Sequence, residues 1–166
     1  MHYKRVMLFS ATGSAPWYSK IWADKSHVND VWELKSGQAN VVIDDEITNM
    51  NSMFNGCSNL TSLDLFTHFN TSKVTNMRNM FCNCYNLTEL DLSSFDTSKV
   101  ENMRNMFWGC ENLTTIKGVI DMKSCTEKYE RMFTNCSKLK GVKIKNPPAE
   151  FESVSGLSKS QYTVIY

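Results

Sequence analysis

Apolar residues recur along this chain with a period of about 26 residues. Their pattern in one copy is Val74, Met77, Met80, Phe81, Cys84 and Leu87, and in the next Val100, Met103, Met106, Phe107, Cys110 and Leu113. A repeat of this length is typical of solenoids, in which each copy forms one coil. A single coil cannot bury its apolar positions alone. We therefore expect each copy to stack against the matching positions of its neighbours.

Four copies of the pattern cover residues 47–73, 74–99, 100–125 and 126–145. Residues 1–46 lack the pattern and are rich in aromatic residues, so we interpret them as an N-terminal cap of short strands and a short helix. Pro147 and Pro148 end the repeat, and we interpret residues 146–166 as a C-terminal cap. The pattern predicts one structural domain with 47–145 as its repeat region.

The first half of each copy contains the spacing M-x-x-M-F, which has the three-residue interval of one face of a helix. We therefore predict a short helix or 3₁₀ turn there. Two residues after each phenylalanine stands a glycine or an asparagine: Gly56, Asn83, Gly109 and Asn135. These residue types tolerate the left-handed conformation best, so we predict a positive φ at all four positions.

The second half of each copy has the alternation of a strand, as in Leu87-x-x-Leu90-x-Leu92. Copies stacked in register would give a parallel sheet on one side and short helices on the other, which is an α/β leucine-rich-repeat solenoid of about four coils. In that sheet the leucines would point inward. The residues expected to point outward include Asp64, Phe66, Glu89, Asp91, Lys117 and Lys143.

The motif MxxMFxxCxxLxxLDLSxFDTSxVxNM resembles the leucine-rich repeat of the BspA-like bacterial surface proteins, a repeat also found in mycoplasma lipoproteins and in prophage genomes. The resemblance covers residues 47–144 and is most specific in 77–107. It implies a leucine-rich-repeat solenoid used for binding, commonly as a surface adhesin. The sequence departs from the motif at 116–118, where Ile-Lys-Gly replaces Leu-Asp-Leu, and at 122–125, which lacks Phe-Asp-Thr-Ser.

Charge and hydropathy exclude several classes of protein. The formal net charge is +1 and 21% of residues are charged, so the totals argue against nucleic acid as the sole partner. The apolar runs fall far below the roughly 18 residues of a membrane span, and we predict no membrane insertion. The N-terminal apolar stretch, Val6 to Phe9, is too short for the core of a secretory signal.

Four of the six cysteines, Cys57, Cys84, Cys110 and Cys136, occupy one slot of successive repeats. We expect them to form a buried ladder of reduced thiols. Adjacent coils would lie about 4.8 Å apart, within disulfide reach, so pairing remains the alternative. Cys82 and Cys125 lie outside the ladder, and either could be exposed. Cys82 and Cys84 lack a second Cys or His pair at zinc-ligand spacing, so we predict no metal site.

Catalytic signatures are absent from the sequence: we find no H-E-x-x-H, no G-x-S-x-G, no phosphate-binding glycine loop and no dinucleotide-binding glycine motif. A Cys–His nucleophile pair would join a cysteine of the buried ladder to His68 in a loop. We therefore predict that the protein is not an enzyme and needs no cofactor.

Two surfaces are candidates for binding a partner. On the predicted sheet face the acidic residues Asp64, Glu89 and Asp91 precede the basic residues Lys117 and Lys143, an arrangement that suits a charged protein partner. The alternative is that these charges follow the repeat pattern and keep the surface soluble. On the helix-to-strand edge, Tyr85 and Trp108 stand at slots otherwise filled by small or polar residues, and both types are common in binding hot spots.

These observations predict a non-enzymatic protein-binding module. Small size, terminal caps, the lack of an export signal and reduced thiols favour an intracellular partner. One such role is a phage- or mobile-element-encoded inhibitor of a host defence protein in the host cytoplasm. The family resemblance supports the alternative, an adhesin or receptor-binding protein at the bacterial surface or on a virion.

Overall fold

The structure, a computed structural model, describes residues 39–40, 48–58, 60–64 and 71–166 of the 166-residue chain. Its strands are β1 (Ala39–Asn40), β2 (Ser62–Asp64), β3 (Glu89–Asp91), β4 (Thr115–Lys117), β5 (Val119–Asp121), β6 (Val142–Lys145) and β7 (Tyr162–Ile165). The helix α1 (Phe151–Ser155) and a 3₁₀ turn (Lys159–Gln161) lie between β6 and β7. Except for β1, the predicted N-terminal cap lies outside the described residues.

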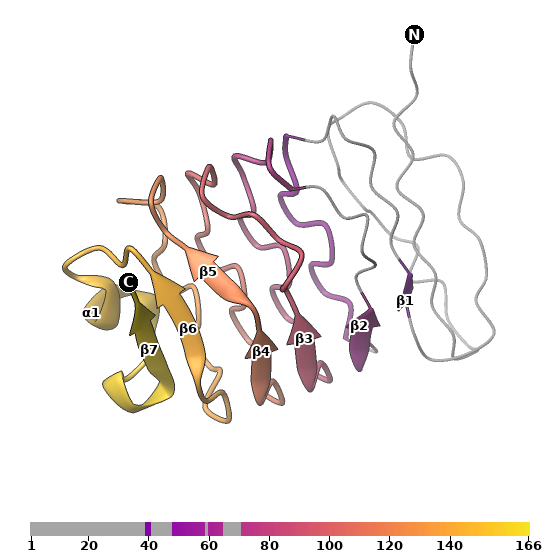
Figure 1. Ribbon diagram of the computed structural model, residues 1–166. Helices are drawn as coiled ribbons and strands as arrows, with labels where there is room; N and C mark the ends of the chain where they lie inside the picture. Colours follow the sequence, from indigo (N-terminus) through magenta and orange to yellow (C-terminus); the bar gives the residue numbers. More distant parts are fainter. Residues whose placement is uncertain (1–38, 41–47, 59, 65–70) are drawn as a thin grey trace, which may run out of the picture.

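The strands form two parallel sheets, in the orders β1-β2-β3-β4 and β5-β6-β7 (Figure 1). In the first sheet Leu63 pairs with Leu90 and Leu90 pairs with Ile116, so each residue lies beside its equivalent in the next repeat copy. The predicted parallel sheet is therefore confirmed. The described part of the chain is a mixed α/β structure with parallel sheets and few helices.

The third copy interrupts its strand at Gly118, and this interruption separates the two sheets. Gly118 has φ of 91°, and a β-carbon there would lie 2.7 Å from the carbonyl carbon of Leu92. After this residue the chain forms β5, which pairs with β6 so that Ile120 lies beside Ile144. Within this sheet, paired residues are 24 positions apart instead of the 26 that separate Leu90 from Ile116. A constant repeat period of 26 residues would instead place Val142 beside Ile116.

The M-x-x-M-F segments form consecutive turns and no helix. Several of their N–H groups bond the carbonyl three residues earlier, as Met80 bonds that of Met77 (3.2 Å), so the predicted 3₁₀ turn is closer to the structure than the predicted helix. These turns cover residues 51–56, 78–83, 104–109 and 130–135. In an α-helix each N–H would bond the carbonyl four residues earlier. Here alternate N–H groups donate to the next copy instead, as Phe81 does to the oxygen of Met106 (2.8 Å) and Asn83 to that of Trp108 (2.8 Å). Backbone bonds between layers therefore replace those of a helix.

Left-handed residues recur at every fourth position of these turns, which explains why no helix forms. The predicted slot is confirmed, with φ of 76° at Gly56, 61° at Asn83, 76° at Gly109 and 66° at Asn135. A second slot four residues earlier also has positive φ, at Ser52, Asn79, Asn105 and Arg131. A left-handed residue inside the segment ends any right-handed helix. Asparagine is the residue besides glycine that adopts this conformation most readily.

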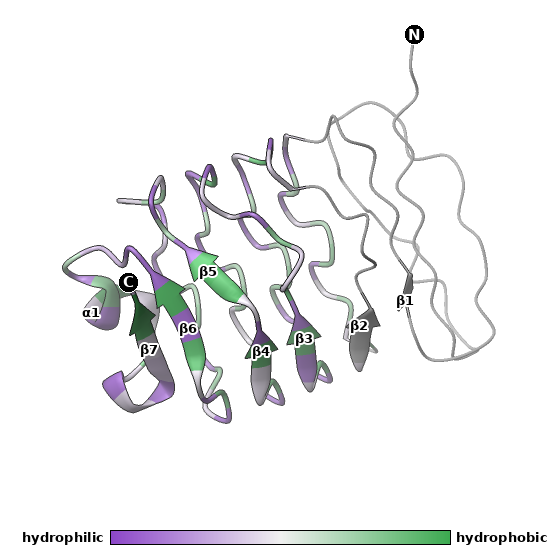
Figure 2. Cartoon of the chain, viewed as in Figure 1, coloured by the Kyte–Doolittle hydropathy of each residue, from purple (hydrophilic) through white to green (hydrophobic). Residues whose placement is uncertain are grey.

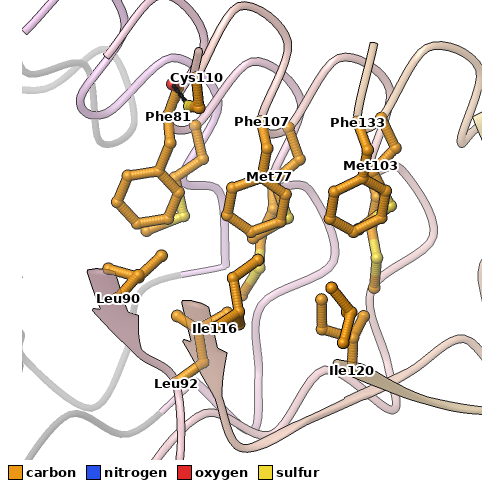
Figure 3. Close-up of a cluster of buried hydrophobic side chains, with 14 of the residues drawn as sticks. Met77, Phe81, Leu90, Leu92, Met103, Phe107, Cys110, Ile116, Ile120 and Phe133 are labelled. Carbon is orange, nitrogen blue, oxygen red and sulfur yellow. Dashed lines mark hydrogen bonds between the residues drawn. The ribbon is translucent and has the colours of Figure 1, made fainter. Parts of the chain in front are cut away.

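The core lies between the turns and the strands and is built from rows of equivalent side chains. Phe54, Phe81, Phe107 and Phe133 stack with ring centroids 5.1, 5.6 and 5.2 Å apart and nearly parallel planes. Figure 3 shows Leu90 opposite Phe81, Ile116 opposite Phe107 and Ile120 opposite Phe133. Ile120 of β5 therefore continues the apolar row beyond the interruption at Gly118. Each buried side chain of this size contributes about 1.5–3 kcal/mol relative to an exposed one.

The cysteine slot forms a second row of contacts between layers. The thiols of Cys84, Cys110 and Cys136 donate to the carbonyl oxygens of phenylalanines one copy earlier, at 3.2, 3.1 and 3.0 Å. All six cysteines are free. Cys57 is half-buried and the other five are buried. Cys82 and Cys125, whose exposure the sequence did not decide, are therefore not at the surface.

The segment 146–166, predicted as a cap, lies against the last repeat copy. Phe133 donates its N–H to the oxygen of Ser155 (2.8 Å), so the end of α1 takes the place that the next copy would have. The ring of Phe151 contacts those of Tyr129 and Tyr162, with centroids 6.1 and 5.3 Å away. The Gln161 amide donates to the Leu139 oxygen (2.9 Å) and joins the start of β7 to the fourth copy.

Candidate functional site

The outward side chains of the strands form the first candidate surface. In β3 and β4 the central residue is buried and its two neighbours are exposed, and β6 alternates in the same way. The exposed residues predicted to bind a partner are Glu89, Asp91, Lys117 and Lys143. Asp64 belongs to β2, but its side chain is not described, and Phe66 lies outside the described residues. Figure 2 shows hydrophilic residues on β3 and more hydrophobic positions on β5 and β6.

From β3 to β6, the charges on this face alternate in sign from strand to strand. Asp91 lies in register with Lys117, and Asp121 of β5 lies in register with Lys145 of β6. The predicted residues keep their order, with the acidic ones on β3 and the lysines on β4 and β6, but Asp121 of β5 adds an acidic residue among the basic strands. Sequence reasoning missed Asp121, because the interruption at Gly118 that brings it into the sheet was not anticipated. Opposite charges in such neighbouring positions stabilise each other by a few tenths of a kcal/mol.

Asp91 is further held by a local turn. The N–H of Ser93 donates to its Oδ1 at 2.9 Å. Hydrogen bonds from the side chain and backbone of Ser93 hold the pKa of the Asp91 carboxyl below its ordinary value, and Lys117 adds a smaller effect in the same direction. Asp91 is therefore charged at neutral pH and already has local partners for that charge.

Glu89 and Lys143 differ from these pairs because neither lies beside an opposite charge. Glu89 is in register with Ser62 and Thr115, and Lys143 with Val119 and Thr163. Both side chains are exposed. They lie two repeat layers apart, which corresponds to roughly 10 Å in the stacking direction. These two residues carry the charge on this face that is most available to another molecule.

The second candidate surface contains Tyr85 and Trp108, which lie on consecutive repeat copies: the N–H of Asn83, two residues before Tyr85, donates to the Trp108 carbonyl oxygen at 2.8 Å. Tyr85 has 41% of its surface exposed, whereas Trp108 is half-buried. Trp108 is the repeat equivalent of Cys82. Tyr85 lies three residues after Cys82, so the two aromatic residues occupy different positions of the repeat. Among the described residues no ring contact joins the two side chains. The side-chain amide of Asn112 donates to the backbone carbonyl oxygen of Tyr85 at 2.8 Å.

In the part of the chain that the structure describes, no group of three or more His, Cys, Asp and Glu side chains is arranged to hold a metal ion. The same residues include no helix with the length and apolar character to span a bilayer.

Residues 25–146, which are well over half of the chain, match the model of one family described as a Mycoplasma protein of unknown function, DUF285. No curated protein and no solved structure matches the chain. The matched region contains all four repeat copies and every strand from β1 to β6. The chain therefore belongs to the DUF285 family of Mycoplasma proteins.

Proposed function

We propose that the chain is a leucine-rich-repeat solenoid of about four coils, of the BspA-like type, and that it acts as a non-enzymatic protein-binding module. The repeat period, the stacked phenylalanines and the backbone bonds between successive turns support the solenoid. A stack held by hydrogen bonds on one side and a buried core in the middle fixes the positions of the outward side chains. Rigid presentation lowers the entropy that a binding surface loses when it meets its partner.

The observation that carries this proposal is the pair of exposed charges without a neighbour of opposite sign, Glu89 and Lys143. From β3 to β6 two pairs of opposite charge lie in register, Asp91 with Lys117 and Asp121 with Lys145. Unmatched charges lose no existing interaction when a partner supplies the opposite charge. The partner that fits this face has a basic group for Glu89 and an acidic group for Lys143. These two residues lie two layers apart and, because Glu89 pairs with Thr115 and Lys143 with Val119, also four residues apart along the strand direction.

For the cellular setting we propose an intracellular partner, with inhibition of a host defence protein by a phage- or mobile-element-encoded chain as one form of this role. The six free thiols support it, because reduced cysteines are typical of reducing compartments. The alternative is a surface or virion-associated adhesin, which the resemblance to the BspA-like repeats favours. Neighbouring genes separate the two: defence or anti-defence genes favour inhibition, and tail or cell-wall genes favour adhesion.

The test is affinity capture from the native host followed by mass spectrometry, with three forms of the full chain. The first is the native sequence. The second exchanges the two unmatched charges, Glu89→Lys with Lys143→Glu, and keeps the net charge. The third exchanges two exposed charges of the turn side, Glu101→Lys with Lys128→Glu, as a matched control.

We expect one protein to be captured by the native chain and by the control, and to be lost with the Glu89/Lys143 exchange. Equal capture by all three forms would contradict binding through the sheet face. Loss with the control alone would place the contact on the turn side.

A further inference from the structure

The last strand of the described chain, β7, has an edge that no described residue pairs with. The sheet order β5-β6-β7 leaves one side of β7 free. An unpaired edge presents a row of backbone N–H and C=O groups to another strand, and proteins usually protect such edges with charges, prolines or bulges. Residues 161–166, Gln-Tyr-Thr-Val-Ile-Tyr, contain no charged side chain and no proline. This edge therefore lacks the usual protection.

The backbone direction at this edge follows from the bonds of β6. Met122 donates its N–H to the oxygen of Lys145 at 2.9 Å, so the backbone groups of Lys145 face β5. Backbone groups alternate in direction along a strand, and those of Ile144 therefore face β7. Ile144 pairs with Val164, and in a parallel ladder the residues on either side of Val164 then face β6. The N–H and C=O of Val164 point away from the sheet.

The side chains of β7 leave the core incompletely covered at the same edge. Tyr162 and Val164 lie in register with Val142 and Ile144, which are fully buried. Tyr162 and Val164 are only half-buried, although they occupy the same inward row. Tyr166, which follows β7, is fully exposed. An apolar row that is buried in β6 and half-exposed in β7 is suited to a further strand.

We infer that this edge binds the β7 edge of a second copy of the chain and forms a two-fold symmetric, antiparallel dimer. A two-fold axis at Val164 would place Val164 opposite its counterpart and Tyr162 opposite Tyr166 of the other copy. The outward backbone groups of these three residues would form about six hydrogen bonds. Both tyrosines would extend the inward apolar row, and Tyr166 would become covered. This inference does not depend on the proposed function of the outward sheet face.

Charge complementarity favours a second copy over a charged peptide as the occupant. The side chains of the pairing segment are all uncharged, so those of two copies meet without charge repulsion. Lys143 and Lys145 lie on β6, one strand away from the edge. The β6 lysines of the two copies would be about three strand spacings apart, roughly 14 Å. Lys159 lies nearer to the edge, with its Nζ over the Tyr162 ring at 5.0 Å from the centroid.

Sedimentation equilibrium of the full chain over a wide range of protein concentration tests this dimer. We expect the average mass to rise from that of one chain towards that of two. Val164→Pro removes an outward N–H and leaves the bonds to β6 intact, which is the position where a strand tolerates proline. It should raise the dissociation constant at least about tenfold. Val164→Ala, which keeps the N–H, is the matched control and should change it less.

Tyr166→Asp is a second disruptive variant in case Val164→Pro impairs folding. Tyr166 is fully exposed, so the fold should not change, but the new charge would lie beside Tyr162 of the other copy. Circular dichroism of each variant verifies the fold. A native chain that stays monomeric at every concentration would overturn the inference. The inference would also be overturned if Val164→Pro and Tyr166→Asp both folded and dimerised as strongly as the native chain. Assemblies larger than two chains, which edge segments without charged side chains can form, would overturn it as well.

Discussion

The carbonyl oxygen of Phe81 accepts the thiol proton of Cys110, one repeat copy later, over 3.1 Å. The N–H of Cys84, in the same copy as Phe81, donates to the same oxygen at 3.2 Å. Both lone pairs of this buried carbonyl are therefore used. One bond closes the turn and the other joins two layers.

Replacing Cys110 with alanine should lower the free energy of unfolding by about 1–3 kcal/mol, because it removes a buried sulfur and its hydrogen bond. Cys57→Ala is the matched variant in the same slot, where the side chain is only half-buried. Cys57→Ala should lower the free energy of unfolding by less than Cys110→Ala does. Chemical denaturation of both variants measures the difference, and equal losses would argue against the role of the thiol row.

Stability should fall in alkaline solution because of the buried thiols. Burial raises the pKa of Cys57 and of Cys125 from 9.0 to about 11, and it raises that of Cys84 well above 9.0. In the unfolded chain these thiols ionise near pH 9, whereas in the folded chain they stay neutral. The stabilisation is complete below pH 9 and is lost as the pH rises towards 11 and beyond.

Denaturation at pH 8, 9, 10 and 11 measures this decline, with the matching alanine variants as controls. Native protein at pH 8 should also resist thiol alkylation until it is unfolded, and then yield six free thiols. Rapid alkylation of the native protein at pH 8 would contradict the burial of the thiol row.

Gly109→Val should destabilise the protein more than Gly56→Val. Both glycines have φ of 76°, which a β-branched residue adopts at a cost of roughly 1–2 kcal/mol. A β-carbon at Gly109 would also lie 2.7 Å from Oδ1 of Asn83, whereas at Gly56 nothing lies within 4 Å. Melting temperatures separate the two effects. Equal shifts would show that the Asn83 side chain moves aside freely, and an unchanged melting temperature in both would contradict the left-handed turn.

A double-mutant cycle on Asp91→Asn and Lys117→Gln should give a coupling energy of about 0.2–1 kcal/mol that decreases as salt is added. The same cycle on Glu89→Gln and Lys143→Gln should give no coupling, because these residues lie on strands that do not pair directly. Coupling between Glu89 and Lys143 in the isolated chain would mean that their charges are already matched.

Much of this fold could be predicted from repeat spacing. The positive φ at Asn83 and Asn135 followed from residue type alone, and the parallel sheet followed from the register of the leucines. A helix and a turn could not be distinguished in these segments, because the three-residue spacing of Met77 and Met80 fits both. The distinguishing signal was Asn79, four residues before Asn83, since two left-handed positions in one turn segment exclude a helix.

The candidate site was less predictable because it depends on strand register. Lys117 was correctly expected to be exposed, but its pairing with Asp91 shows that much of the expected charge separation is neutralised locally. Gly118 moves the chain by two residues relative to the fourth copy, and this shift brings Asp121 beside Lys145. A repeat alignment that keeps a constant period cannot reveal such a shift.

The proposal that the sheet face binds a protein is tested most directly by association kinetics with the captured partner. We expect the exchange of Glu89 and Lys143 to lower the association rate constant about tenfold or more at low ionic strength, with a smaller effect as salt increases. Trp108→Ala should leave that rate unchanged. Binding through the sheet face would be contradicted by an association rate constant that the exchange leaves unchanged at every salt concentration, together with loss of binding in Trp108→Ala. That result would place the contact on the turn side.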